Sequence, residues 1–464
     1  MNLGFIESKT YDEISVGDTA GTEHVLTTDD AMAFASISGF NSVLNSDELI
    51  DRAGGIPPTG PNMWCASLIS GLFSMNIPGP GCTLTDVSLS FQNRIRVGDR
   101  ILVKVKVTAK DDATKKVMFD CEAANGAGTP IFSGTAQVIA PLSTSRYSTL
   151  PVPRLIVNNP YRHYVGMIAR ATAKPAVKTA IAWPCDEVSL GGAIQAYKDK
   201  LIIPVLVGSE TIIRAVAETL KLDLSGLRIV NVETSRMAAV RAVELAAKGE
   251  VQMLMKGSLH TDEIMGVAVS REGGLRAGRR ISHVFALDVP SYHKPLFVTD
   301  AAVNIQPDLE TKIHILQNAI DMLTTLEVVN PKVAILSAVE SINPAIPSTL
   351  DAAALCKMVD RGQITGAIVD GPLAFDNAIS SDAARIKKIN SPVAGDPDIL
   401  MVPNLEAGNI LFKELQYLAG ALAAGVVVGA KVPIVLTSRA DGELARMASC
   451  ALGVLLAKPA PVQA

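Results

Sequence analysis

Short apolar runs alternate with segments of helical periodicity over the last two thirds of the chain. The runs are rich in Val, Ile and Leu and include LIIPVLVG, VQMLMKG, PKVAILSAVE and VPIVLTS, whereas SRMAAVRAVELAAKGE and TLDAAALCKMVDRGQ place apolar residues with the period of a helix. This alternation predicts a doubly wound α/β domain built on a parallel sheet. Because roughly 300 residues exceed the usual size of one open sheet, we expect two α/β lobes with a cleft between them.

The first third of the chain has a different pattern. The segment PNMWCASLISGLFSMNI is apolar on nearly every side, which is typical of a fully buried helix. The later segments VKVKV, KKVMFDCEAA and IFSGTAQVIA are separated by short polar turns and predict hairpins of an antiparallel sheet. We expect an α+β domain in which this sheet wraps around the helix.

A proline-rich stretch separates the two patterns. The text PLSTSRYSTLPVPRLIVNNPYRHY runs from Pro141 to Tyr164, is rich in Pro, Ser and Asn, and shows little periodicity. We therefore predict a first domain over residues 1–147, a linker over 148–164 and a second domain over 165–464.

Composition narrows the class of protein. The chain has 464 residues, 48% of them hydrophobic and 19% charged, which excludes a disordered or fibrous protein. The net charge of −4, without a basic stripe, argues against a nucleic-acid partner. The six cysteines are scattered and contain no C-x-x-C pair, which argues against a metal centre and is typical of a reducing cytoplasm. We find no secretory signal, and the apolar stretch LQYLAGALAAGVVVGA (415–430) is too short to span a membrane and predicts a buried helix.

Polar residues interrupt the predicted strands at their carboxyl ends. In an open parallel sheet these ends face a common crevice, and helix N-termini point into it, so ligands bind there. Each such residue alone is more often a helix cap, a turn residue or a paired surface charge, and only their convergence favours a binding site. The candidates are Lys256, Ser258, His260, Thr261, Asp300, Glu340, Asp370, Asp376, Asn404, Ser438, Arg439 and Asp441.

The segments at these strand ends resemble one family. G-x-x-x-x-G-K-[ST], G-x-G-x-x-G and G-x-S-x-G are all absent, which removes the main support for kinases, dinucleotide enzymes and α/β-hydrolases. Instead, LMKGSLHT, GLRAGRRISHVFALDVP, VTDAAVNIQPDLETK, VAILSAVE, DGPLAFDNAIS, DPDILMVPNLEAGNILFK and VPIVLTSRAD, in this order, resemble the phosphate acetyl/butyryltransferase family. The resemblance implies a two-lobed, dimeric or larger cytoplasmic enzyme, without bound metal or cofactor, that interconverts acyl-CoA plus inorganic phosphate with acyl phosphate plus coenzyme A.

The same resemblance implies roles for individual residues. Ser438 would hydrogen-bond the reacting carbonyl or thiol, Arg439 would bind phosphate and Asp441 would act as the base, since this reaction passes through a tetrahedral oxyanion and deprotonates a thiol in one direction. Acetyl-specific relatives place the base farther along, where this chain has Glu443 and Ala445. Members of the family often carry a basic residue soon after the His-Thr of the LMKGSLHT segment, where this chain reads DEIMGVAV. Three arginines remain to join Arg439 in the phosphate site: Arg276, Arg279 and Arg280.

The first domain resembles a second family, the MaoC-type (R)-specific enoyl-CoA hydratases of hot-dog fold. The similar segments are TTDDAMAFASISG, ASLISGLFSMNIPGPG and SFQNRIRVGDRI, so the whole chain resembles bifunctional enoyl-CoA hydratase/phosphate acetyltransferases. The Asp and His of the hydratase D-x-N-P-x-H segment are missing here, because the text reads SGFNSVLNSDE and puts Phe40, Leu44 or Asn45 at those positions. Asp47 alone could not make both proton transfers. We expect a domain without hydratase catalysis that serves to bind acyl-CoA or to form oligomers, with an active, truly bifunctional hydratase as the alternative.

Overall fold

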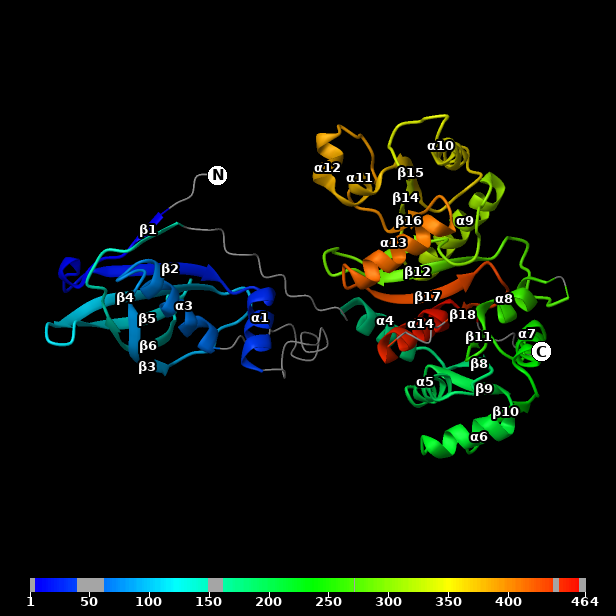
Figure 1. Ribbon diagram of the computed structural model, residues 1–464, viewed down its shortest axis with the longest axis horizontal. Coiled ribbons are helices and arrows are strands. Elements are labelled where there is room, and N and C mark those ends of the chain that lie inside the picture. The colour runs from blue at the N-terminus through cyan, green and yellow to red at the C-terminus, as the bar shows by residue number, and fades with distance from the viewer. Residues whose placement is uncertain (1–4, 40–61, 149–161, 271, 437–441, 459–464) are drawn as a thin grey trace. The chain divides into compact units, whose positions relative to one another are not determined.

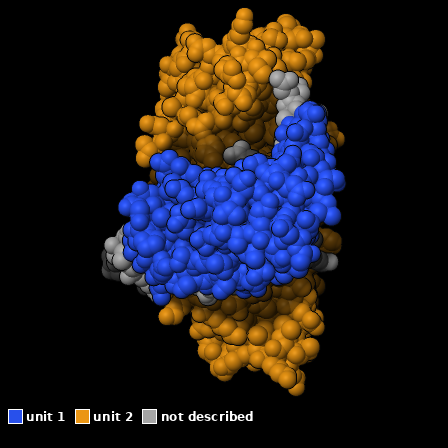
Figure 2. All heavy atoms as spheres, turned by 90° about the vertical axis from the view of Figure 1, so that its left-hand side faces the viewer, with its two compact units in different colours: residues 1–157 blue, residues 158–464 orange. Residues whose placement is uncertain are grey.

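The computed structural model describes residues 5–39, 62–148, 162–270, 272–436 and 442–458. The chain divides into two compact units, Met1–Val157 and Asn158–Ala464, which are coloured separately in Figure 2. Most of the predicted linker, residues 149–161, lies outside the described residues. Each unit has its own apolar core and is described by itself.

Unit 1 is an antiparallel sheet packed on one central helix. The sheet has the strand order β2-β4-β5-β6-β3, and its amphipathic strand β4 buries every second residue, as the alternating text predicts. Helix α3 packs its apolar residues against strands β2, β3 and β4, so the helix predicted from its uniformly apolar text lies in the core. The elements are β1 (Phe5–Glu7), η1 (Tyr11–Glu13), β2 (Thr19–Val25), α1 (Thr28–Ser38), α3 (Asn62–Met75), β3 (Thr83–Phe91), β4 (Arg100–Asp111), β5 (Lys116–Asn125), β6 (Pro130–Ile139) and β7 (Arg146–Ser148).

Unit 2 is an α/β structure with one eleven-stranded sheet in the order β10-β9-β8-β11-β18-β17-β12-β13-β16-β14-β15 (Figure 1). Its strands are β8 (Val177–Ala182), β9 (Ile202–Gly208), β10 (Arg228–Asn231), β11 (Met253–Lys256), β12 (Ser282–Asp288), β13 (Leu296–Thr299), β14 (Lys332–Leu336), β15 (Ile368–Leu373), β16 (Ile399–Met401), β17 (Leu422–Val428) and β18 (Ile434–Val435). Its helices are α4 (Arg162–Thr172), α5 (Glu187–Lys198), α6 (Glu210–Thr219), α7 (Ser235–Ala247), α8 (Thr261–Val269), α9 (Leu309–Thr325), α10 (Pro347–Asp360), α11 (Phe375–Ile379), α12 (Ser381–Ile386), α13 (Leu405–Tyr417) and α14 (Glu443–Leu456).

The doubly wound α/β architecture is confirmed, but the expectation of a wholly parallel sheet is wrong. Two parallel groups, β10-β9-β8-β11-β18 and β13-β16-β14-β15, are joined by the antiparallel strands β17 and β12 into one mixed sheet. Both joining strands escaped the sequence pattern, and the predicted buried helix over residues 415–430 is in fact the end of α13 followed by β17. A short, fully apolar run is compatible with either a buried strand or a buried helix. Here the β-branched residues of GVVV favour the strand.

The last helix of the chain closes the core of unit 2. Helix α14 packs against α4 and β17, and every residue from Met447 to Leu455, together with Ala445, is almost entirely buried. Gly453 is required at the closest approach, because a Cβ atom there would clash with Sδ of Met253. Within the described ranges no helix is both long and apolar enough to cross a membrane.

Candidate active site

The strand directions divide the candidate residues into two groups. Strands β11 and β18 are parallel to each other, β17 is antiparallel to β18 and to β12, and β12 is antiparallel to β13. The carboxyl ends of β11 and β18 therefore point the opposite way from those of β13, β14, β15 and β16. The expectation that all polar strand ends share one edge is thus wrong, because it assumed a wholly parallel sheet.

The first group follows β11, where the chain makes a tight turn. Lys256 is buried, and its Nζ donates to the carbonyl oxygens of Gly257 at 3.2 Å and Leu259 at 3.3 Å. The Oγ of Ser258 donates to the carbonyl of Trp183 at 2.9 Å, and this ties the turn to the end of β8. Gly257 admits no side chain, since a Cβ atom would clash with that same carbonyl oxygen. The loop is therefore packed in one conformation, with His260 and Thr261 beginning helix α8.

The three proposed catalytic residues, Ser438, Arg439 and Asp441, lie outside the described residues. The elements on either side of them are β18 and α14. Strand β18 pairs in parallel with β11, with Val435 opposite Met255. Strand β18, which precedes this segment in the sequence, therefore ends beside the Lys256 turn.

A cavity of about 840 Å³ at the carboxyl end of β13 carries a concentration of arginines. Arg276 forms a β-bridge with Ala430, just beyond β17, and its Nε donates to the carbonyl of Val269 at 2.7 Å. The guanidinium of Arg280 donates to the hydroxyl of Thr311 at 3.0 Å. Both bonds go to neutral oxygens, and no ion pair of Arg276 or Arg280 is found among the described residues. Arg280 has an acidic neighbour in the same cavity, Asp308, whose pKa is lowered by hydrogen bonds from Thr311 and by the charge of Arg280. The lining residues include Arg276, Arg279, Arg280, Asn304, Gln306, Asp308, Glu310, Thr311 and His314.

Arg279 differs from its two neighbours. Its guanidinium forms an ion pair with the carboxylate of Asp321 on α9, so its charge is matched within the fold. The structure thus favours Arg276 and Arg280 over Arg279 as anion ligands.

Asp300 does not line this cavity but supports a residue that does. Its side chain is buried, and its carboxylate accepts hydrogen bonds from the backbone N–H groups of Ala302, Val303 and Asn304, and from Nδ2 of Asn304 at 2.6 Å. Burial raises the pKa of Asp300 above its ordinary value, although the four hydrogen bonds oppose the shift. Asn304, which lines the cavity, also donates to the carbonyl of Ile281 at 3.0 Å. The geometry makes Asp300 a positioning residue for Asn304. The sequence analysis missed Asn304, although Asn304 follows the same strand end as Asp300.

The remaining candidates lie farther along the same edge. Glu340 and Asp376 share the ammonium of Lys387, at 3.2 Å and 3.0 Å, and this ion pair lowers the pKa of Asp376. Asp370 accepts a hydrogen bond from the N–H of Gly371 at 2.9 Å. Asn404 caps helix α13 by accepting from the N–H of Ala407 at 3.0 Å. These contacts account for all four side chains by local structure.

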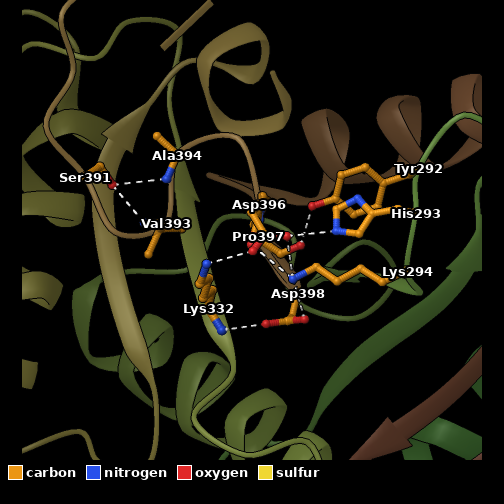
Figure 3. A network of polar contacts seen from close by, with 10 residues as sticks. All are labelled: Tyr292, His293, Lys294, Lys332, Ser391, Val393, Ala394, Asp396, Pro397 and Asp398. Carbon is orange, nitrogen blue, oxygen red and sulfur yellow. Dashed lines mark hydrogen bonds and ion pairs between the residues drawn. The ribbon is translucent and has the colours of Figure 1, made fainter. Parts of the chain in front are cut away.

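The amino ends of the same strands carry a dense ionic network (Figure 3). Lys294 and Lys332 contact the carboxylate of Asp396 at 3.0 Å and 2.7 Å, and Lys294 also contacts Asp398 at 2.8 Å. The hydroxyl of Tyr292 donates to the carbonyl of Pro397 at 2.7 Å. Burial alone would raise the pKa of Asp396, but the two lysines outweigh it and lower that pKa to about 2. The network joins the starts of β13, β14 and β16, so we interpret it as structural. Among the described residues no cluster of His, Cys, Asp and Glu is suited to a metal ion.

Known proteins resemble this chain over the part that holds these sites. Residues 235–453 match the family model described as phosphate acetyl/butaryl transferase. A phosphate acetyltransferase of Rhizobium meliloti is 57% identical over 294 residues, which cover 63% of this chain and 93% of the relative. The chain belongs to the phosphate acetyl/butyryltransferase family. A phosphate butyryltransferase of Clostridium acetobutylicum is 41% identical over 63% of this chain and 97% of its own length. The crystal structure of a branched-chain phosphotransacylase from Enterococcus faecalis superposes with a TM-score of 0.53 at 30% identity, covering 60% of this chain and 98% of that one.

Proposed function

We propose that unit 2 catalyses the reversible transfer of an acyl group between coenzyme A and inorganic phosphate. The thioester carbon of acyl-CoA accepts a phosphate oxygen, the C–S bond breaks, and the thiolate of CoA leaves and takes up a proton. Membership of the family carries this proposal, and the arginine-lined cavity supports it. Relatives named for acetyl and for butyryl transfer both match, and the higher identity of the acetyltransferase favours acetyl.

Three residues between β18 and α14 would carry the chemistry. Ser438 would donate to the reacting carbonyl or thiol, Arg439 would bind the phosphate and Asp441 would hold the thiol proton. A cation, a hydroxyl and a carboxylate are sufficient for these steps, so we propose coenzyme A as a substrate and no resident metal or cofactor. Residue 437 follows Ala430 by seven positions, and the chain between them spans at most about 25 Å. The bridge of Ala430 to Arg276 therefore keeps the cavity within this reach of the catalytic segment.

We propose that unit 1 is a hot-dog domain without hydratase catalysis. A central helix packed on a five-stranded antiparallel sheet supports the fold. Residues 40–50, where hydratases carry their Asp and His, lie outside the described residues, so the argument there rests on Phe40, Leu44 and Asn45 in the sequence. At the start of α3, the side-chain amide of Asn62 donates to the carbonyl of Asn93 and accepts from the N–H of Ile95, so this polar side chain is part of the fold.

The structure brings one His–Asp pair together in unit 1 that the sequence analysis did not identify. Nε2 of His24 lies 3.3 Å from Oδ2 of Asp30, and the His24 ring meets that of Trp64 edge-on at 5.4 Å. Oδ2 of Asp30 also accepts from the N–H and the hydroxyl of Thr27, which caps helix α1. Burial works against these bonds, but together with His24 they lower the pKa of Asp30, and a carboxylate with a lowered pKa is a weak base. We therefore interpret the pair as part of the helix cap.

Two assays test the proposals separately. For unit 2, release of CoA from acetyl-, propionyl- and butyryl-CoA is followed with and without phosphate; phosphate-independent release would contradict acyl transfer. For unit 1, hydration of crotonyl-CoA is measured for the full chain, the His24→Ala variant and a Ser438→Ala/Arg439→Ala double variant. We expect background rates for all three. Turnover that persists in the double variant and disappears in His24→Ala would establish the bifunctional alternative. We further propose a cytoplasmic location and a homo-oligomer.

A further inference from the structure

One face of helix α9 contacts a single arginine of the cavity, Arg280. Thr311, His314 and Asn318 recur at i, i+3 and i+7, so they share one face of the helix. The guanidinium of Arg280 bonds to Thr311, and the backbone N–H of Arg280 donates to Nδ1 of His314 at 3.3 Å. The backbone carbonyl of Arg280 accepts from Nδ2 of Asn318 at 2.8 Å. The side chain and both backbone polar groups of Arg280 are therefore bonded to the same helix.

At Arg280 these side chains take the place of a neighbouring strand. The ladder of β12 with β17 begins at Ser282, and its ladder with β13 begins at Val284, so Arg280 lies before both. A backbone N–H and C=O outside a ladder need other partners, and α9 supplies both of them here. The direction in which Arg280 leaves the start of β12 therefore depends on His314 and Asn318.

Asn318 is enclosed and held in one orientation. It is 4% exposed, on a helix whose buried residues are mostly apolar. Its Nδ2 donates to Oγ of Ser282 at 3.0 Å as well as to the carbonyl of Arg280. A Cβ atom on Gly429 would lie 2.5 Å from this Nδ2, so the backbone after β17 closes over the amide. Because a buried amide is costly without partners, these two bonds fix Asn318 and, through it, Arg280.

His314 serves Arg280 as a hydrogen-bond acceptor. A neutral imidazole has one acceptor and one donor nitrogen, so the bond at Nδ1 places the ring proton on Nε2. The His314 side chain lines the cavity together with that of Arg280. The same ring thus forms part of the cavity wall and fixes the backbone of the arginine beside it.

We propose that His314 and Asn318 are positioning residues that hold Arg280 in the orientation in which it binds phosphate. This inference rests on the proposed acyl transfer and adds two residues that do not touch the reacting atoms. An arginine whose backbone is already fixed loses less conformational freedom when it binds an anion, so its affinity is higher. Asp308 lines the same cavity, so the orientation of Arg280 also decides whether its guanidinium meets this carboxylate or the substrate anion.

Steady-state kinetics of the full-length protein test the inference, with phosphate and acetyl-CoA varied separately. His314→Phe removes the acceptor and Asn318→Leu removes the donor, each at similar volume. Each variant should raise the KM for phosphate about fivefold, and kcat and the KM for acetyl-CoA should stay within about twofold of the parent, because binding is weakened equally in the ground and transition states. Circular dichroism and melting curves confirm that each variant is folded.

Two further variants separate positioning from a general loss of structure. His314→Asn restores an acceptor near the position of Nδ1 and should return the KM for phosphate to within about twofold of the parent. Gln317→Leu is the matched control, because Gln317 also lies on α9 and bonds through its amide to Asp321 and Thr365, but not to Arg280. This control should leave the KM for phosphate within about twofold of the parent.

A double-mutant cycle shows whether His314 acts through Arg280. Arg280→Ala alone should raise the KM for phosphate about tenfold. Adding His314→Phe to Arg280→Ala should then change this KM by less than about twofold, because the arginine to be positioned is gone. Multiplied effects in the double variant would overturn the inference. So would a parental KM in His314→Phe and Asn318→Leu, or a His314→Asn variant no better than His314→Phe. In these cases the parent still releases CoA in dependence on phosphate, whereas a parent without this activity would overturn the proposed function together with the inference.

Discussion

Acidification should destabilise unit 2 through one buried histidine, His283 in the central strand β12. The side chain is almost fully buried, its ring lies edge-on to Phe285, and within the described part of the chain its Nδ1 has no hydrogen-bond partner. Burial lowers the pKa of His283 to about 3, from an ordinary value of 6.5. The folded protein thus keeps this imidazole neutral, whereas the unfolded chain protonates it below pH 6.5.

The size of the effect follows from that difference. Protonation of the unfolded chain costs stability as the pH falls from 6.5 toward 3, at up to about 1.4 kcal/mol per pH unit, and nothing is lost above 6.5. Between pH 7.5 and pH 5 this single group should remove about 2 kcal/mol, and at most about 5 kcal/mol near pH 3. His283→Met removes the titrating group and the unpartnered nitrogen at similar volume, so it should change stability by less than about 1.5 kcal/mol at pH 7.5.

The chain offers a specific reporter for unit 2. It contains two tryptophans, Trp64 in α3 of unit 1 and Trp183 after β8 in unit 2. A Trp64→Phe background leaves Trp183 as the sole tryptophan, so urea unfolding followed by its fluorescence reports unit 2. In that background the free energies of unfolding with His283 intact and with His283→Met should diverge by about 2 kcal/mol between pH 7.5 and pH 5, with the histidine protein losing more.

Parallel losses would refute this reasoning. If the two proteins lost stability equally over that pH range, His283 would be protonated to the same extent in the folded and unfolded states. The strand would then admit water or a partner to Nδ1, contrary to the packing described here.

Three further predictions concern the ionic network and the active site. Asp396→Asn should lower the free energy of unfolding by about 1 kcal/mol, a value discounted because the Asp396 side chain is partly exposed. In the parent protein, the stability that the Asp396 carboxylate contributes should be lost as the pH falls from 3.8 toward 2, and urea titrations at several pH values would measure this loss. Arg276→Ala should raise the KM for phosphate about tenfold in steady-state assays, whereas Arg279→Ala, whose charge is already paired, should change it less than twofold. Arg439→Ala should lower kcat/KM for phosphate by a factor that corresponds to ~2–4 kcal/mol of lost transition-state stabilisation. Ser438→Ala should act chiefly on kcat. If both variants had the kinetics of the parent, the active site would lie elsewhere.

Periodicity predicted the elements whose pattern is unambiguous. The text SRMAAVRAVELAA forms helix α7, VQMLMKG contains β11, and the apolar segment that starts at Pro61 contains α3. Each of these either repeats with one period or is bounded by turn residues. The element type then follows from local sequence.

The central strands could not be predicted in the same way. SHVFALD and LAAGVVV are buried on both faces and carry no alternation, so β12 was not predicted and β17 was assigned to a helix. Without β12 and β17, the remaining strands form two separate parallel groups. The sequence pattern then does not show that these two groups run in opposite directions. Whether a strand is parallel or antiparallel depends on the strands that pair with it, and the local sequence does not identify those strands.

The candidate site shows the same limit. Lys256, the last residue of β11, and Asp300, directly after β13, were found because the strand-end rule needs only sequence. Whether such a residue faces a ligand or supports the fold depends on packing, and Asp300 lies behind Asn304 with all its bonds inside the protein. Arg279 and Arg280 are adjacent in sequence, yet only Arg279 forms an ion pair among the described residues, because its partner Asp321 comes from helix α9.

The most direct test of acyl transfer by this chain is to trap its product. Full-length protein is incubated with acetyl-CoA and phosphate, CoA release is followed with a thiol reagent, and the acyl phosphate is captured with hydroxylamine as the hydroxamate. We expect CoA and hydroxamate to form in equal amounts, in strict dependence on phosphate, and both to be lost in Arg439→Ala. CoA release without phosphate, or hydroxamate formation that Arg439→Ala leaves unchanged, would contradict the account.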